Sequence, residues 1–166
     1  MIIPRITGGI GNQLFIYAAA RRLAMKNDTD LVLDSVSGFS YDKDYNRHYQ
    51  LDHFNISARK ATATERLEPF SRVRRFLKRS WNKKLYIEKR NYIEEEGFNF
   101  HSQLLNLRLR NKVYLEGYFQ SEKFFKDCEK QIKQDLLIDP PKDNKNINLF
   151  NIIKNKTAVA IHIRFF

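Results

Sequence analysis

The first 34 residues carry a β-α-β pattern, and this pattern constrains the fold more than any other part of the sequence. A short apolar stretch at residues 2–6 runs into Gly8-Gly9-Ile10-Gly11, and apolar residues then recur at helical spacing over residues 14–24. A second apolar stretch, residues 31–33, ends at Asp34. Two strands joined through a helix lie parallel in one sheet. The sequence therefore predicts an α/β fold with a parallel sheet.

The glycine turn is the first candidate binding element. Gly8, Gly9 and Gly11 permit positive φ angles and a close approach of the backbone to a ligand. We expect Asn12 to cap the following helix, whose free N–H groups and positive dipole end suit an anion or a sugar nucleotide. The spacing matches neither G-x-G-x-x-G nor a P-loop. A tight turn whose glycines serve packing alone is the alternative.

A final strand over residues 157–164 offers a second candidate. Alternation places His162 and Arg164 on one side of this strand, at the carboxyl end of a parallel sheet, where open α/β folds bind ligands. The planar, charged fork of Arg164 suits a diphosphate. A structural histidine and a solvated arginine are the alternatives.

Positive charge is concentrated in one segment. The formal net charge is +11, and residues 59–90 hold twelve basic against three acidic residues. Within this segment Phe70, Val73, Leu77 and Trp81 recur at helical spacing, which predicts a basic amphipathic helix from residue 69 to residue 81. Its apolar stripe either packs on its own domain or lies on a membrane surface, and phosphate or nucleic-acid contact is a third option.

For that helix we expect a basic face that binds anionic vesicles, made by Arg72, Arg75, Lys78 and Arg79. The segment has no recognised nucleic-acid motif, so no specific nucleic acid is expected as a partner.

The remaining elements are less marked. Residues 35–60 read as a loop with a short element near residues 51–56. Strands are expected at residues 85–88 and 113–117, and a helix capped by Ser121 over residues 122–137. A Pro-rich break at residues 139–144 precedes a short helix at residues 147–154.

Several function classes are disfavoured. No apolar run reaches the roughly 20 residues of a membrane span, and the amino-terminal apolar stretch is too short for a signal peptide, so we expect a cytoplasmic protein. The four histidines are scattered, and we predict no metal site. Cys128, the single cysteine, excludes an internal disulfide. The run Glu94-Glu95-Glu96 is expected to be a solvated turn.

Three stretches together resemble the bacterial α-1,2-fucosyltransferases of glycosyltransferase family 11. The resemblance covers the whole chain as the amino-terminal half of such an enzyme. The stretches are Gly8-Gly9-Ile10-Gly11-Asn12-Gln13-Leu14-Phe15 with Tyr17-Ala18, Leu115-Glu116-Gly117-Tyr118-Phe119-Gln120-Ser121-Glu122-Lys123-Phe124-Phe125, and Val159-Ala160-Ile161-His162-Ile163-Arg164.

The resemblance implies an inverting, metal-independent and cofactor-free transferase of polysaccharide biosynthesis. It moves L-fucose from GDP-fucose to the 2-hydroxyl of a galactose-terminated acceptor, on two Rossmann-like domains that face across a cleft in the GT-B arrangement. Arg164 matches the arginine expected to neutralise the donor diphosphate, with His162 beside it. The glycine loop with Asn12 and Gln13 is expected to face the cleft.

The same resemblance divides the chain into three parts. Residues 1–139 are expected to form a Rossmann-like acceptor-side domain, residues 140–156 a linker with a short helix, and residues 157–166 the first strand of a missing donor-binding domain. In the family the last strand continues with a second arginine and Gly-Asp, where this chain has Phe165 and Phe166.

Two functions from different classes follow. The first is the acceptor half of a fucosyltransferase, whose catalytic base is expected outside this chain. The 166 residues alone should then transfer no measurable fucose. The second is a non-catalytic basic module that binds an anionic membrane surface, as a peripheral protein at its inner face, or nucleic acid.

Overall fold

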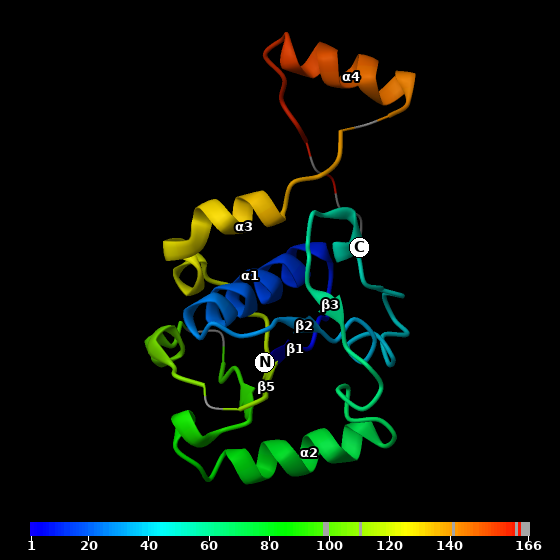
Figure 1. The fold of residues 1–166 in the computed structure, drawn as a ribbon. Coiled ribbons are helices and arrows are strands. Elements are labelled where there is room, and N and C mark those ends of the chain that lie inside the picture. The colour runs from blue at the N-terminus through cyan, green and yellow to red at the C-terminus, as the bar shows by residue number, and fades with distance from the viewer. Residues whose placement is uncertain (98–99, 110, 141, 162, 164–166) are drawn as a thin grey trace.

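A computed structural model describes residues 1–166 except 98–99, 110, 141, 162 and 164–166 (Figure 1). Its strands and α-helices are, in chain order, β1 (Ile2–Pro4), α1 (Ile10–Lys26), β2 (Val32–Leu33), β3 (Arg59–Lys60), α2 (Ser71–Asn82), β4 (Tyr92–Glu94), β5 (Val113–Glu116), α3 (Glu129–Asp135) and α4 (Asn144–Lys154). Short 3₁₀ helices are η1 (Leu51–His53), η2 (Ile87–Lys89), η3 (Ser102–Asn106), η4 (Glu122–Phe124) and η5 (Lys126–Cys128).

The strands are parallel wherever they pair. β5 lies between β1 and β4, and β2 pairs with β3. Parallel bridges from Ile2 to Leu31 and from Arg5 to Asp34 join the two groups, which gives the order β3-β2-β1-β5-β4. The α/β prediction is confirmed, and the layered arrangement is that of a Rossmann-like domain.

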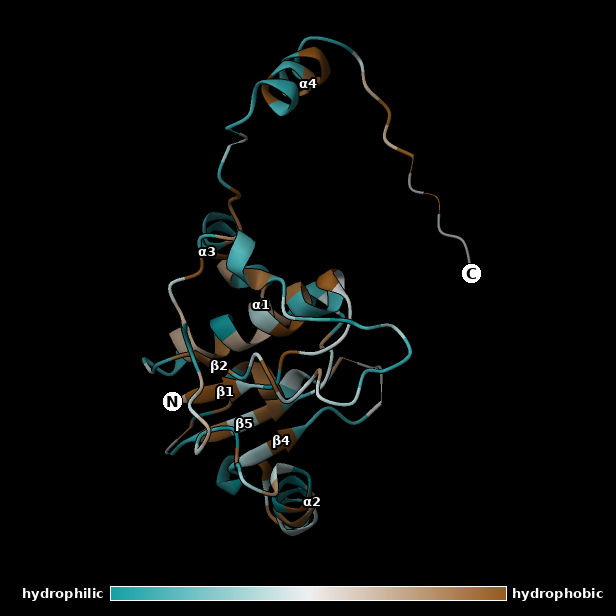
Figure 2. Cartoon of the chain, turned by 90° about the vertical axis from the view of Figure 1, so that its right-hand side faces the viewer, coloured by the Kyte–Doolittle hydropathy of each residue, from teal (hydrophilic) through white to brown (hydrophobic). Residues whose placement is uncertain are grey.

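The sheet lies between α1 on one face and α2 on the other (Figures 1 and 2). Alanine and leucine favour a helix at α1, and its apolar side chains pack against the strands. The main core includes buried side chains from β1, α1 and β5, among them Ile2, Ile16, Tyr17, Leu23, Val113 and Leu115. Asp135 of α3 accepts hydrogen bonds from Tyr17 and Arg21, which fixes α3 on α1.

The helix expected at residues 69–81 is present as α2, but its apolar stripe faces solvent and its opposite side packs on the sheet. Arg75 and Asn82 are buried, whereas Phe70 and Trp81 are 77% and 69% exposed. The covered face of the sheet carries Glu94 and Glu116, and these partly buried carboxylates require cations rather than apolar partners. The interpretation that the apolar stripe packs on its own domain is therefore wrong.

The expected vesicle-binding face also needs correction. Arg75 lies 3.5 Å from Asp34, and Arg79 lies 3.1 Å from Glu94 and 2.8 Å from Glu116. Two of the four cations assigned to that face therefore point into the protein and are already paired.

Two expected elements differ for local reasons. The strand expected at residues 85–88 is wrong, since η2 occupies this region and the strand is β4. The helix expected over residues 122–137 divides into η4, η5 and α3 because Phe125 leaves helical geometry, with φ −142° and ψ 10°. The cap is confirmed, since the Ser121 hydroxyl accepts the Lys123 N–H.

The last part of the chain departs from the expected strand. α4 forms where a short helix was predicted, with Asp143 as its cap, and all of its residues are exposed. Residues 157–161 and Ile163 have no strand structure, because no described strand lies beside them to supply hydrogen bonds. His162 and Arg164 lie outside the described residues.

Replacing Arg79 tests the orientation of α2. Arg79→Met should lower the free energy of unfolding by about 2–4 kcal/mol, because it leaves Glu94 and Glu116 without a principal cation. The matched control is Arg74→Met on the outer side of the same helix, which should change it by less than about 0.5 kcal/mol. Urea unfolding measures both, and equal losses would contradict the inward placement of Arg79.

Candidate functional site

The candidate site is the carboxyl edge of the sheet. Polar and charged residues stand where the strands end: Arg5 follows β1, Asp34 follows β2, and Glu94 and Glu116 end β4 and β5. Gly8 begins the turn from β1 to α1 at this same edge. The predicted position of the glycine turn, beside the strand that contains residues 31–33, is confirmed.

The turn depends on Gly8. Its φ is +78°, and a Cβ there would lie 2.7 Å from Asn12 Nδ2 and 3.2 Å from Tyr118 Cε1. A side chain at Gly9 or Gly11 would meet nothing within 4 Å. The chain itself therefore requires glycine at position 8, while positions 9 and 11 present bare backbone to open space.

The helix begins earlier than expected. Gly9 is the N-cap of α1 and its carbonyl accepts the Gln13 N–H at 3.1 Å, so Gly11 and Asn12 lie in the first helical turn. The prediction that Asn12 caps the helix is wrong, because the backbone has already completed its reversal at Gly8.

The buried side chain of Gln13 stabilises the glycine turn by hydrogen bonds. It is completely buried, and its Nε2 donates to the carbonyls of Gly8 and His48, both at 2.9 Å. Its Oε1 accepts the Gln50 N–H at 2.9 Å. Gln13 therefore fixes the turn to the loop after β2, and no polar atom of its amide is free for a ligand.

Asn12 links two of the stretches on which the family resemblance rests. Its Oδ1 accepts a hydrogen bond of 2.6 Å from Nε2 of Gln120. Asn12 comes from the first turn of α1, and Gln120 from the segment after β5. The structure thus brings together the first two stretches, while His162 and Arg164 of the third lie outside the described residues.

The turn after β5 is held in an unusual backbone conformation. Gly117 has φ +153°, and a Cβ there would overlap the side chain of Glu95. Phe119 is buried with φ +51°, which is rare for a bulky residue. The Glu95 carboxylate accepts the N–H groups of Tyr118 and Phe119 at 2.7 and 2.9 Å, which stabilises this strained turn.

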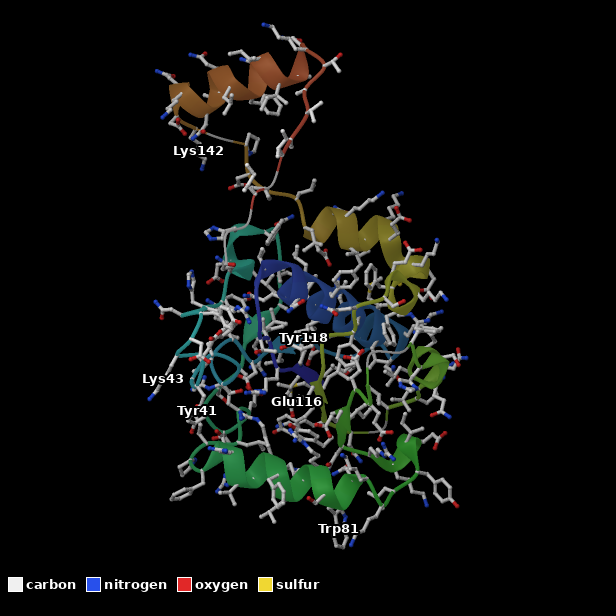
Figure 3. The ribbon with its side chains drawn as sticks, turned by 180° about the vertical axis from the view of Figure 1, so that it is seen from behind. Tyr41, Lys43, Trp81, Glu116, Tyr118 and Lys142 are labelled. Atoms are coloured by element: carbon white, nitrogen blue, oxygen red, sulfur yellow. The ribbon has the colours of Figure 1, made fainter. Side chains whose placement is uncertain are left out.

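A charge network lies beneath the edge, between the sheet and α2, with Glu116 at its centre (Figure 3). Arg5 and Arg79 contact its two oxygens at 2.6 and 2.8 Å, and the Tyr92 hydroxyl also donates to it. Burial opposes ionisation of Glu116, but the Tyr92 hydrogen bond and the two arginines outweigh it and lower its pKa. Burial and the negative charge of Glu116 raise the pKa of Tyr92.

A cavity of about 550 Å³ lies beside the free edge of β4. Its polar lining includes Arg90, Glu94, Glu95, Glu96, His101 and Gln103. The expectation of a solvated turn at residues 94–96 is wrong for Glu94 and Glu95, because the first pairs with Arg79 and Lys83 and the second holds the turn after β5. Recognising Tyr92-Ile93 as a strand would have placed these carboxylates at a sheet edge.

Two further observations concern the part of the chain that the structure describes. No three of its His, Cys, Asp and Glu side chains are arranged to hold a metal ion. None of the helices described has the length and apolarity needed to cross a membrane.

Comparison with curated proteins finds two relatives, both glycosyltransferases of Escherichia coli. The chain is 25% identical over 169 residues to an alpha-1,2-colitosyltransferase, covering 99% of this chain and 54% of that protein. It is 28% identical over 187 residues to the O-antigen biosynthesis glycosyltransferase WbnK, covering 96% of this chain and 57% of that protein.

The chain thus spans about half the length of the curated relatives it matches. No protein-family model matches it, and no solved structure does. Its similarity to glycosyltransferases runs through both the glycine turn and the segment after β5.

The turn can be tested by comparing two of its glycines. Gly8→Ala should lower the free energy of unfolding by about 1–3 kcal/mol, because alanine at φ +78° is strained and its Cβ meets Asn12. Gly11→Ala should instead be neutral or stabilising by about 0.5 kcal/mol, since it adds helix propensity in open space. Thermal and urea unfolding measure the difference, and equal effects at the two sites would contradict this geometry.

The Glu116 network should make stability depend on pH. Because the folded pKa of Glu116 is lowered, its contribution is complete above the unfolded pKa of about 4.3 and is lost as pH falls through the folded value. Glu116→Gln should therefore be less stable than the original chain at pH 7 by about 1–3 kcal/mol. The difference in the free energy of unfolding between the two proteins should narrow between pH 5 and pH 2, as measured by urea unfolding. A difference that stays constant with pH would show that folding does not shift the pKa of Glu116.

Proposed function

We propose that this chain forms the acceptor-side part of a glycosyltransferase that moves L-fucose from GDP-fucose to the 2-hydroxyl of a galactoside during synthesis of a surface polysaccharide. The observation that carries the proposal is its similarity to two glycosyltransferases over 99% and 96% of its length. The name of one relative, an alpha-1,2-colitosyltransferase, contains the same α-1,2 linkage that the resemblance implies.

The residues at the carboxyl edge suit a sugar acceptor. Sugar hydroxyls both donate and accept hydrogen bonds, and Asn12 and Gln120 offer amide groups of both kinds. The N–H groups in the first turn of α1 have no partner within the helix, and Gly9 and Gly11 leave them uncovered. In the proposed role these groups bind and orient the acceptor.

The transfer itself requires groups beyond this edge. The acceptor 2-hydroxyl oxygen forms a bond to the anomeric carbon of fucose as the bond from that carbon to the diphosphate oxygen breaks. The hydroxyl proton passes to a base, and GDP leaves with the electron pair of the broken bond. We assign the diphosphate contact to Arg164, with His162 beside it, on the motif alone. We place the base outside this chain.

The alternative, a non-catalytic basic module, is less well supported as the main function. Two of the four cations that the sequence assigned to its binding face, Arg75 and Arg79, pair with carboxylates of the protein. It also gives no reason for the similarity to transferases across the glycine turn.

Ligand binding to this chain tests the acceptor assignment. A β-galactoside should shift the NMR signals of the Asn12 and Gln120 amides, and Gln120→Ala should weaken its binding about fivefold through loss of one hydrogen bond. Gln134→Ala, at an exposed position of α3, is the matched control. No shift at these amides would remove the acceptor role from this edge.

The donor assignment needs a separate measurement. GDP-fucose should bind this chain weakly, and transfer should appear only when the same sequence is joined to a nucleotide-binding half. Mass spectrometry of the product distinguishes transfer of fucose from transfer of colitose, the sugar in the name of one relative. Turnover by the 166 residues alone, abolished by Arg164→Ala, would place the donor site within this chain.

A further inference from the structure

The outward face of α2 is apolar and aromatic. Phe70, Val73, Leu77 and Trp81 recur every three or four residues and are 77%, 56%, 60% and 69% exposed, and Phe76 beside them is 63% exposed. Figure 3 shows Trp81 on the outer side of the helix. A surface helix of a soluble domain normally turns such a stripe toward the core. We call these five residues the outer stripe.

Contacts on the opposite side of α2 keep the outer stripe exposed. Arg75 and Arg79 pair with carboxylates of the sheet edge, and the Asn82 side chain accepts the N–H groups of Asn91 and Tyr92. Turning the stripe inward would break all of these contacts and remove cations from the buried Asp34 and the partly buried Glu94 and Glu116. The exposure is therefore a consequence of the fold.

The charge around the outer stripe indicates what it meets. No acidic residue occurs from Pro69 to Ile87, a segment with seven cations. Four of the seven have no carboxylate within 4.0 Å among the described residues. One of them, Lys78, lies over the Tyr114 ring of β5, so the exposed unpaired cations are Arg72, Arg74 and Lys84. Apolar and aromatic residues beside unpaired cations are typical of helices that lie in the surface of an anionic bilayer.

A second copy of this chain fits the surface less well. Contact between two outer stripes would bring two acid-free cationic segments together, which electrostatic repulsion opposes. α2 also lies at the end of the molecule opposite α4, on the face of the sheet away from α1 (Figures 1 and 2). A flat partner can therefore approach it without meeting the other helices.

We propose that α2 docks the protein on an anionic lipid bilayer, with the outer stripe among the acyl chains and the unpaired cations on the headgroups. This surface is separate from the carboxyl edge, and the proposal does not depend on the glycosyltransferase assignment. It differs from the sequence expectation in that Arg75 and Arg79 take no part, because they pair with carboxylates of the protein.

Trp81 is the single tryptophan and reports directly on the outer stripe. With vesicles of phosphatidylethanolamine and phosphatidylglycerol, its emission should shift to the blue, and bromine-labelled acyl chains should quench it. Vesicles of phosphatidylcholine should produce little change, and high salt should weaken binding to the anionic vesicles. Equal binding to anionic and phosphatidylcholine vesicles, or the absence of any emission shift and quenching, would overturn the proposal.

Cosedimentation with the same vesicles separates the contribution of the apolar side chains from that of the cations. Phe70→Ser with Leu77→Ser should reduce partitioning at least tenfold, and Arg74→Gln with Lys84→Gln by about tenfold or more. Matched controls are Phe150→Ser with Ile153→Ser on exposed α4, and Lys130→Gln with Lys145→Gln. Circular dichroism shows that each variant is folded.

Two outcomes assign the surface to another partner. A concentration-dependent dimer without lipid that is lost in Phe70→Ser with Leu77→Ser would favour a second copy of the chain. Displacement from vesicles by a single-stranded oligonucleotide at equal phosphate concentration would favour nucleic acid. Either result would overturn the bilayer proposal.

Discussion

The carboxylate of Glu116 is the constraint on which the arrangement of sheet and helix depends. It ends β5, it is largely buried, and its oxygens accept from Arg5, Tyr92 and Arg79. A buried charge of this kind is tolerated only with close partners. Once Arg79 must point inward, helical spacing carries Arg75 and Asn82 inward with it. The apolar residues of α2 are then left on the solvent side.

The sequence was most informative where the pattern is local. The β-α-β unit and β5 follow from apolar runs and glycine, and the helix at α2 follows from its periodicity. The periodicity could not show which side of α2 meets the protein, because that depends on Glu94 and Glu116, which are distant in sequence. β4 is only three residues long, and pairing with β5 stabilises it rather than any pattern of its own.

The candidate site could be predicted only in part for a similar reason. Glycine at position 8 has a local cause, the positive φ of the turn. The role of Gln13 has no such local cause. Its partners are backbone groups of Gly8, His48 and Gln50, and residues of other types at those positions would offer the same groups. The contact between Asn12 and Gln120 joins segments 108 residues apart. The family resemblance named both segments without showing that they meet.

The glycines of the site differ in what requires them. At Gly8 and Gly117 the protein's own side chains occupy the space that a Cβ would need. At Gly11, in the first turn of α1, nothing in the chain occupies it, yet glycine within a helix costs up to about 1 kcal/mol relative to alanine. A residue that weakens the fold and meets no internal neighbour is best explained by a group that approaches from outside. The proposed acceptor role supplies that group, because a sugar can reach the uncovered N–H groups of α1 only where no side chain covers them.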